Sequence, residues 1–333
     1  MNLIKKRVLS GTRPTGKLHI GHLYGAVKNY VALQDDYDCF YTIVDWHALT
    51  SEYENPQIIR NSTYEMVADW LAAGLDPNKS TIFIQSHVKQ HAELHLLLSM
   101  IVPVPWLERV PSYKEQQAQL VDKDLSTYGF LGYPLLQTAD IIIYKAEYVP
   151  VGEDQVPHIE LAREIVRKFN RLYANVFPEP QSLLTEIPII PGIDGRKMSK
   201  SYNNAILLSD SKKEIKEKVS RMITDPQRTH RHIPGNPDVC PVFYLHKVFS
   251  PKQTIETVNI ECRRAGIGCV DCKKMLTEAM LAKLNPFREK RNKYIEDLDY
   301  IKDILKEGNK KAREVAEQTM QEVRKAMSLI VEF

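Results

Sequence analysis

Residues 7–22 of the chain, RVLSGTRPTGKLHIGH, decide its fold. An apolar strand at the start runs into Ser10–Gly16, and a helix is expected from about Ile20 to Gln34. Gly11 and Gly16 permit tight turns and a close approach of the backbone to a ligand. The first turn of the helix offers free N–H groups and the positive end of its dipole to a phosphate. This stretch therefore predicts a phosphate and nucleotide cradle between a strand and a helix.

The alternation of strand and helix continues along the first half of the chain. Compact apolar stretches predict strands, and stretches with helical periodicity lie between them. Such alternation is typical of an α/β fold with a mostly parallel sheet that helices cover. The expected strands are residues 39–45 and 81–86, with a returning strand at 186–191, and the expected helices are residues 56–73 and 91–101.

Three prolines between residues 103 and 111 interrupt this alternation, and beyond residue 202 the pattern is helical almost throughout. We therefore expect a catalytic domain over residues 1–202, with a helical insert at about 103–170, and a helical domain over residues 203–333. The last helix carries an apolar stripe, which predicts packing against the body of the domain. Gly308 is expected to end the helix before it.

The composition is ordinary for a soluble globular protein, with 43% hydrophobic and 26% charged residues among 333. No apolar run approaches the length of a membrane span, and residues 1–10 are expected to form a strand and not a signal peptide. A cytoplasmic location is therefore expected. Residues 203–333 hold 25 Lys and Arg against 19 Asp and Glu. This excess suits either a polyanionic partner such as RNA or an ordinary solvated helical surface.

Two histidines open the first helix, in the string His19-Ile20-Gly21-His22. Because they are three residues apart, they share a helix face and can donate to phosphate oxygens on which charge builds up in a transition state. Gly21 presents no side chain, so a flat adenine or ribose can lie against the backbone there. Metal binding is a weaker alternative, because no carboxylate or third ligand lies nearby in the sequence. A third alternative is two exposed histidines without a ligand.

A second string, residues 195–201 (GRKMSKS), carries two lysines and two hydroxyl groups in a short loop. Lys197 and Lys200 can neutralise the charge of a departing pyrophosphate, and Ser199 and Ser201 can donate to it. Nearby glycines allow the loop to move as an ATP site closes. The alternative is a basic loop that is simply solvated.

Together the two strings resemble the signatures of the class I aminoacyl-tRNA synthetases, which read HIGH and KMSKS, and both match letter for letter. The resemblance implies a Rossmann-type doubly wound parallel sheet as the catalytic domain and a helical C-terminal domain that binds the anticodon region of tRNA. It also implies activation of a carboxylic acid by ATP with Mg²⁺. Catalysis would be alignment and charge stabilisation by His19, His22, Lys197 and Lys200.

The substrate is indicated by residues 132–141 (GYPLLQTADI) and 149–155 (VPVGEDQ), which look like the pocket of bacterial tryptophanyl-tRNA synthetases. The resemblance covers essentially the whole chain and implies that Asp140 accepts the indole N–H of tryptophan. Indole N–H is only a donor, so an acceptor-only carboxylate is a fitting partner. Without the resemblance, Asp140 would be a helix N-cap or a surface carboxylate. A tyrosyl-tRNA synthetase is the alternative, although a phenolic O–H both donates and accepts.

The same resemblance assigns further residues to the site. Tyr133 and Gln155 are expected at the α-amino group, Gln137 stands where many bacterial members have Met, and Arg13 replaces a frequent Gln. Lys114 is expected on a mobile loop over ATP, with an exposed lysine as the alternative. The residues expected at tryptophan are Asp140, Tyr133, Gln137 and Gln155, and those expected at ATP are Arg13, Pro14, Thr15, Gly21, His22, Lys114, Gly152, Glu153, Asp154, Ile190, Lys197, Met198, Ser199, Lys200 and Ser201.

Four of the five cysteines, Cys240, Cys262, Cys269 and Cys272, lie in the helical half, whereas Cys39 is expected as a buried thiol in a strand. Two thiolates three residues apart can chelate one centre, and two more complete a sulfur coordination. A disulfide is not expected in a reducing cytoplasm. The thiolates suit either Zn²⁺ or a [4Fe–4S] cluster. The resemblance favours the cluster, which a subset of tryptophanyl enzymes carries here, and four free thiols are a third alternative.

The expected function is therefore tryptophan–tRNA ligation by a homodimer, with tRNA(Trp), L-tryptophan and ATP as partners and no membrane. Two other classes stay open. One is a nucleotidyltransferase of the wider HIGH-bearing superfamily, which adenylates a small molecule without RNA. The other is an iron–sulfur binding or sensing module whose catalytic site has decayed. The basic helical half argues against the first, and the intact motifs argue against both.

Overall fold

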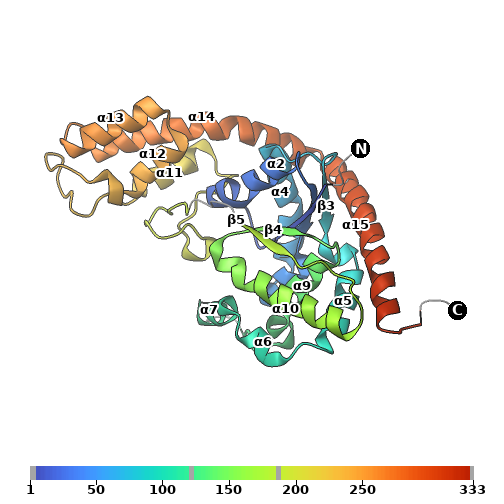
Figure 1. Ribbon diagram of the computed structural model, residues 1–333. Helices are drawn as coiled ribbons and strands as arrows, with labels where there is room; N and C mark the ends of the chain where they lie inside the picture. The colour runs from blue at the N-terminus through green and yellow to red at the C-terminus, as the bar shows by residue number, and fades with distance from the viewer. Residues whose placement is uncertain (1–4, 120–123, 185–188, 331–333) are drawn as a thin grey trace.

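A parallel sheet forms the centre of the first half of the chain (Figure 1). The computed structural model describes residues 5–119, 124–184 and 189–330. Within them the sheet has five strands in the order β3-β2-β1-β4-β5, and every pair is parallel. The predicted Rossmann-type sheet is thereby confirmed. The strands are β1 (Arg7–Thr12), β2 (Asp38–Ile43), β3 (Ser80–Ile84), β4 (Tyr148–Val151) and β5 (Gln181–Leu184).

Helices connect and cover these strands. Up to the second motif they are α1 (Ile20–His22), the π-helical η1 (Leu23–Val27), α2 (Lys28–Leu33), α3 (Asp45–Glu52), α4 (Gln57–Ala73), the 3-10 turn η2 (Gln85–His87), α5 (Gln90–Ser99), α6 (Val104–Glu108), α7 (Pro111–Gln119), α8 (Tyr128–Leu131), α9 (Tyr133–Ile142), the 3-10 turn η3 (Glu153–Gln155) and α10 (Val156–Leu172). From the second motif onward they are η4 (Lys200–Tyr202), α11 (Lys212–Arg221), η5 (Pro237–Val239), α12 (Pro241–Phe249), α13 (Lys252–Arg263), α14 (Cys269–Glu296) and α15 (Leu298–Ala326).

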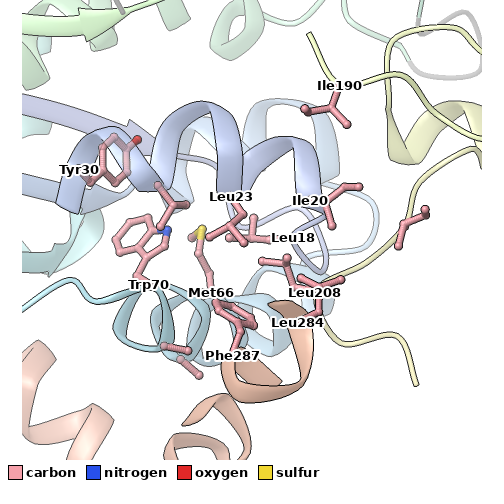
Figure 2. Packing of buried hydrophobic residues seen from close by; sticks show 14 of the residues in the cluster. Leu18, Ile20, Leu23, Tyr30, Met66, Trp70, Ile190, Leu208, Leu284 and Phe287 are labelled. Atoms are coloured by element: carbon pink, nitrogen blue, oxygen red, sulfur yellow. The ribbon is translucent and has the colours of Figure 1, made fainter. Parts of the chain in front are cut away.

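The strands are buried on both faces, and their alternating side chains divide between two apolar clusters. On β2, Cys39 and Tyr41 belong to the cluster that includes α4 and α14, whereas Phe40 between them belongs to the cluster of α5, α9 and α10. Figure 2 shows part of the first cluster, in which Trp70 and Met66 of α4 pack toward the helix that follows β1. This packing fixes the first helix, and with it the HIGH string, above the end of β1.

The last helix covers the edge of the sheet at β3. Its apolar stripe joins the cluster of α5 and α9, and Arg324 near its end forms an ion pair of 2.6 Å with Glu93 of α5. Gly308 lies inside α15 and not at a helix end, so the expectation for this glycine was wrong. The reason is a close approach: a Cβ at Gly308 would overlap the carbonyl oxygen of Ile82, and Asn309 Oδ1 accepts from Ile84 N at 2.8 Å. An edge strand that α15 covers is closed to pairing with another chain.

Helices α11 to α14 form a lobe to one side of the sheet (Figure 1). The end of α14 packs on α4, and there Arg291 is buried beside two carboxylates. Its Nε donates to Asp69 Oδ1 at 2.6 Å, and its Nη2 contacts Glu65. Burial raises the pKa of Asp69 to about 7 against the opposing effect of Arg291. This ion pair ties the lobe to the catalytic sheet.

Two further expectations differ from the structure. The helical insert expected at about 103–170 also contains β4, which pairs with β1 in the central sheet. The strand expected at 186–191 lies partly outside the described residues, and β5 instead precedes it. Short strands such as β4 carry too few residues for a periodic signal. No helix in the described part of the chain has both the length and the apolar character needed to cross a lipid bilayer.

Candidate active site

A cavity of about 410 Å³ opens at the carboxyl ends of β1 and β4. The strand order reverses direction between these two neighbours, and such a switch point is where open α/β sheets bind their ligands. Residues of the first motif region meet there with residues of the predicted tryptophan pocket. The lining includes Arg13, His22, Gln137, Asp140, Gly152 and Gln155.

His22 reaches this cavity from the first helical turn. The backbone N–H of His19 donates to His22 Nδ1 at 3.2 Å, which leaves Nε2 of His22 as the position for its proton. Burial, together with the nearby His19 and Lys200, holds the pKa of His22 well below its usual value. His22 is therefore a neutral imidazole with a donor at Nε2.

His19 lies beside His22 but is buried against the backbone. The two ring centroids are 3.7 Å apart, and a Cβ at Gly21 would lie 2.9 Å from the His19 ring. Gly21 is therefore required for the His19 ring to fold over it. Burial and the charge of Lys200 lower the pKa of His19 to about 4, and its Nδ1 finds no hydrogen-bond partner among the described residues.

Lys200 joins the second motif to the first loop. Its Nζ donates to the carbonyl oxygens of Thr15 at 2.8 Å and Gly16 at 3.2 Å. Burial, and next the charge of Arg13, lower the pKa of Lys200 to about 8. Gly16 has a φ of +105°, which favours glycine and turns these carbonyls toward the lysine.

The rest of the second motif is held by its own loop. Met198 is buried and its backbone N–H donates to Ile190 O at 2.9 Å. Asn204, which the sequence did not single out, accepts from Ser199 N at 2.8 Å and donates to Lys197 O at 3.2 Å. Lys197 is exposed, and neither Lys197 nor Lys200 belongs to the described lining of the cavity. Lys200 is instead held at the first loop through the carbonyl groups of Thr15 and Gly16. The side chain of Ser201 lies outside the described residues.

Asp140 lies near the end of α9 and its carboxylate is buried at the base of the cavity. Oδ2 accepts from His47 Nε2 at 2.9 Å, and Oδ1 accepts from His91 Nδ1 at 2.6 Å. Gln85 Nε2 lies within 2.8 and 2.9 Å of the two oxygens. Burial favours the neutral acid, but the hydrogen bonds from His47 and His91 outweigh it and hold the pKa of Asp140 well below its usual value. The carboxylate is therefore an acceptor only.

A second buried network supports the other wall of the cavity. Ser112 Oγ of α7 lies 2.8 Å from Tyr133 OH and 2.6 Å from His158 Nε2. Burial lowers the pKa of His158 to about 4, so this imidazole is neutral. The predicted residues Tyr133, Gln137 and Gln155 all line the cavity.

Some of the residues predicted at ATP lie outside this cavity. Glu153, Asp154 and Lys114 are exposed and are absent from the described lining, whereas Gly152 beside them is part of it. Pro14 is buried, and Thr15 takes part through its carbonyl group. The cavity thus holds the tryptophan-side residues together with part of the ATP-side set.

Comparisons with known proteins place this site in a family. The family model described as tRNA synthetases class I (W and Y) matches residues 3–285. A curated relative from Thermotoga maritima, named tryptophan–tRNA ligase, is 57% identical over 326 residues, covering 97% of this chain and 99% of the relative. The chain belongs to the bacterial-type tryptophanyl-tRNA synthetases of class I. A relative of the same name from Ralstonia nicotianae is 45% identical over 98% of this chain and 99% of its own length.

A solved member of the tryptophanyl-tRNA synthetases has the same fold. The enzyme from Campylobacter jejuni, in a crystal structure described as complexed with ADP and tryptophan, superimposes with a TM-score of 0.89. It is 35% identical and covers 97% of this chain and 100% of its own. The fold on which the cavity at the switch point is built is therefore shared with a solved tryptophanyl-tRNA synthetase.

The groups that surround Asp140 were not among the residues predicted for the site. Gln85 and His91 follow β3, His47 follows β2, and all three are far from Asp140 in the sequence. His47 lies just after the predicted strand at residues 39–45, and this position at a strand end was the signal that could have marked it as a site residue. His91 and Gln85 carried none, because a single polar residue near a helix start is ordinary.

The four cysteines of the helical lobe gather where η5, α13 and α14 meet. Burial, and then repulsion from Cys240, Cys262 and Cys269, raise the pKa of Cys272 to about 12. Arg228 donates to Cys262 Sγ at 3.6 Å. A Cβ at Gly235 would lie 2.7 Å from the same sulfur, so a glycine leaves it room. In residues 5–119, 124–184 and 189–330, no three or more His, Cys, Asp or Glu side chains are arranged as a formed metal site.

Proposed function

We propose that this chain activates L-tryptophan with ATP and transfers it to the 3′ end of tRNA(Trp), and that the cavity beside Asp140 is where activation occurs. The observation that carries the proposal is a buried, ionised carboxylate in the same cavity as a neutral histidine of the HIGH string. The first suits an indole N–H and the second suits phosphate oxygens. The names of the relatives support tryptophan over tyrosine.

In the proposed reaction the carboxylate of tryptophan attacks the α-phosphorus of MgATP. The P–O bond to pyrophosphate breaks and pyrophosphate leaves. A hydroxyl group of the terminal ribose of the tRNA then attacks the carbonyl carbon of the resulting adenylate, the C–O bond to AMP breaks, and AMP leaves. His22 and His19 stabilise charge on the phosphate oxygens, and Lys200 and Lys197 stabilise the departing pyrophosphate. Alignment of the two substrates supplies the rest of the rate enhancement, and no protein nucleophile takes part.

On the amino-acid side, we assign the indole N–H to Asp140 and the α-amino group to Tyr133 and Gln155. Gln137 lines the cavity next to Asp140 and adds a polar group where many bacterial members carry Met. A site built to accept one N–H rejects a ring that lacks it, because the buried acceptor would lose its partner. Tyrosine would need a group that also donates to its hydroxyl oxygen, and an ionised Asp140 cannot do so.

The test is tryptophan-dependent exchange of labelled pyrophosphate into ATP by the purified full chain. We expect exchange with L-tryptophan and none above background with L-tyrosine. Exchange that depends on tyrosine alone would contradict the assignment of Asp140. Exchange without charging of tRNA(Trp) would favour a nucleotidyltransferase that does not act on RNA.

Lys200 gives the activity a predicted alkaline limit. Because the pKa of Lys200 is lowered to about 8, the ammonium is charged below that pH and neutral above it. We therefore expect kcat/KM for ATP, which reports the free enzyme, to fall as pH rises through about 8. Lys200→Arg keeps its charge in this range, so its profile should lose that step. The same alkaline step in both proteins would assign it to another group.

We further propose that Cys240, Cys262, Cys269 and Cys272 hold a [4Fe–4S] cluster with a structural role near the anticodon-binding surface. Burial and repulsion from the other three cysteines disfavour a thiolate at Cys272, whereas bound metal would stabilise it. Arg228 is the one cation with a described hydrogen bond to these sulfurs. The cluster would supply a fixed cross-link between η5, α13 and α14.

Metal analysis of anaerobically purified protein tests this proposal. We expect iron and acid-labile sulfide in equal amounts with broad visible absorbance, and loss of both in Cys269→Ser. Zinc in place of iron would establish the alternative metal site, and the absence of both metals would leave four free thiols. Cys39→Ser is the matched control, because Cys39 lies in the sheet and its change should leave the metal content unaltered.

The assembly that we propose for the chain follows from its family. Residues 203–333 include the helical lobe, which we propose as the tRNA-binding domain beside a catalytic domain of residues 1–202, although α15 packs on the sheet. A homodimer is proposed as the active form, and the cytoplasm as its location.

A further inference from the structure

The carboxylate of Asp140 has hydrogen-bond partners on two sides. His47 lines the cavity together with Asp140. Gln85 and His91 are fully buried, and neither belongs to the described lining. The partners behind the carboxylate therefore cannot touch a ligand, although they are as close to its oxygens as His47 is.

His91 bridges Asp140 to a residue that the proposed mechanism does not use. Its Nδ1 lies 2.6 Å from Asp140 Oδ1, and its Nε2 lies 2.7 Å from the hydroxyl of Tyr144. The carboxylate can only accept, so Nδ1 carries a proton. When Nε2 accepts in turn from the Tyr144 hydroxyl, every group in the chain is satisfied. The direction of the hydrogen bonds is thus Tyr144 to His91 to Asp140.

Tyr144 is held too firmly to turn away from His91. Its ring stacks on Phe40 with centroids 4.8 Å apart and meets the edge of Phe83 at 5.3 Å. Both phenylalanines lie on strands of the central sheet. His91 and Tyr144 therefore connect Asp140 to the packed strands of the central sheet.

Gln85 is also fixed in one orientation. Its Oε1 accepts from the backbone N–H of Trp46 at 3.1 Å, which directs its NH₂ group at Asp140. With His91 and Gln85 both donating, the carboxylate cannot turn to present a protonated oxygen. His47, which contacts the other oxygen, lines the cavity together with Asp140.

We propose that Tyr144 and His91 are positioning residues that hold Asp140 as an acceptor-only group aimed at the indole N–H, and thereby set the preference for tryptophan over analogues without that N–H. The inference rests on the proposed function. It adds two residues that touch no substrate and act through Asp140 alone.

The test compares L-tryptophan with β-(3-benzothienyl)-L-alanine, in which sulfur replaces the indole N–H, by pyrophosphate exchange. Tyr144→Phe removes only the hydroxyl group. We expect the ratio of kcat/KM for the two amino acids to shrink about fivefold, the effect of one ordinary hydrogen bond, while KM for ATP stays unchanged. His91→Gln, whose amide can still accept and donate, should retain more of the ratio than His91→Leu.

Tyr41→Phe is the matched control. Tyr41 is fully buried in the same sheet, and its hydroxyl donates to Tyr30 O at 3.0 Å, away from Asp140. The Tyr41→Phe protein should have the same ratio of kcat/KM for the two amino acids as the wild type. If Tyr144→Phe lowered kcat/KM for both amino acids by one common factor, Tyr144 would be structural only and the inference would be overturned. A wild-type protein without tryptophan-dependent exchange would instead overturn the proposed function.

Discussion

Asp140→Asn is expected to lower kcat/KM for tryptophan in pyrophosphate exchange by at least about a hundredfold, with little change in KM for ATP. The carboxylate accepts from His47, His91 and Gln85, all of which are donors. An asparagine has one acceptor oxygen, so its NH₂ group must face at least one of them. The indole N–H then loses its acceptor, and a buried donor is left unpaired at a cost of about 1–3 kcal/mol.

The control for this variant is a buried aspartate outside the cavity. Asp225 accepts from the backbone N–H groups of Asn236 at 2.7 Å and Gln227 at 2.9 Å, in the helical lobe. Asp225→Asn should alter stability without changing the KM for tryptophan. Thermal unfolding of both variants separates loss of fold from loss of binding. If Asp140→Asn kept its tryptophan KM and lost affinity for ATP, the assignment of Asp140 to the indole would be wrong.

Gly308→Ala is expected to destabilise the protein by roughly 2–4 kcal/mol. In a helix that faced solvent, the same change would stabilise the protein by about 1 kcal/mol. The sign of the change in the free energy of unfolding is therefore the test. At Gly308 the added Cβ would overlap the Ile82 carbonyl oxygen and lie 2.7 Å from its carbon. Both belong to the backbone of β3, which cannot move without breaking its pairing with β2.

Urea unfolding followed by circular dichroism measures this effect. Gly129→Ala is the matched control, because Gly129 lies in the helix α8 and a Cβ there would meet nothing within 4 Å. The control should leave the free energy of unfolding unchanged or slightly raised. A Gly308→Ala protein as stable as the wild type would mean that α15 does not press on β3 as closely as described.

The two motifs were predictable because each is local. The HIGH string sits at a strand–helix junction, and a cradle there needs only neighbouring residues, such as Gly21 beneath the His19 ring. The second motif was predicted as a unit, but its two lysines have different places. Lys200 binds carbonyl groups of the first loop, whereas Lys197 is exposed. That difference depends on how the loop folds around Asn204, and no spacing of lysines indicates it.

Gly308 shows how a local rule fails in a tertiary context. A glycine near a helix end is a common stop signal, and the sequence contains nothing that distinguishes a stop from a close approach. The distinction comes from β3, more than 200 residues earlier in the chain, whose backbone fills the space that a side chain would take.

From the sequence alone we predicted the class of fold, the site of nucleotide chemistry and, through the family resemblance, Asp140 as the residue that accepts the indole N–H. These depend on periodicity and on motifs, which are properties of short segments. The tertiary structure alone decided that Asp140 is ionised and held in place, because His47, Gln85 and His91 reach it from three separate elements and Tyr144 holds His91. A carboxylate buried in the cavity wall stays charged only where several donors converge, and convergence is a property of packing and not of any single segment.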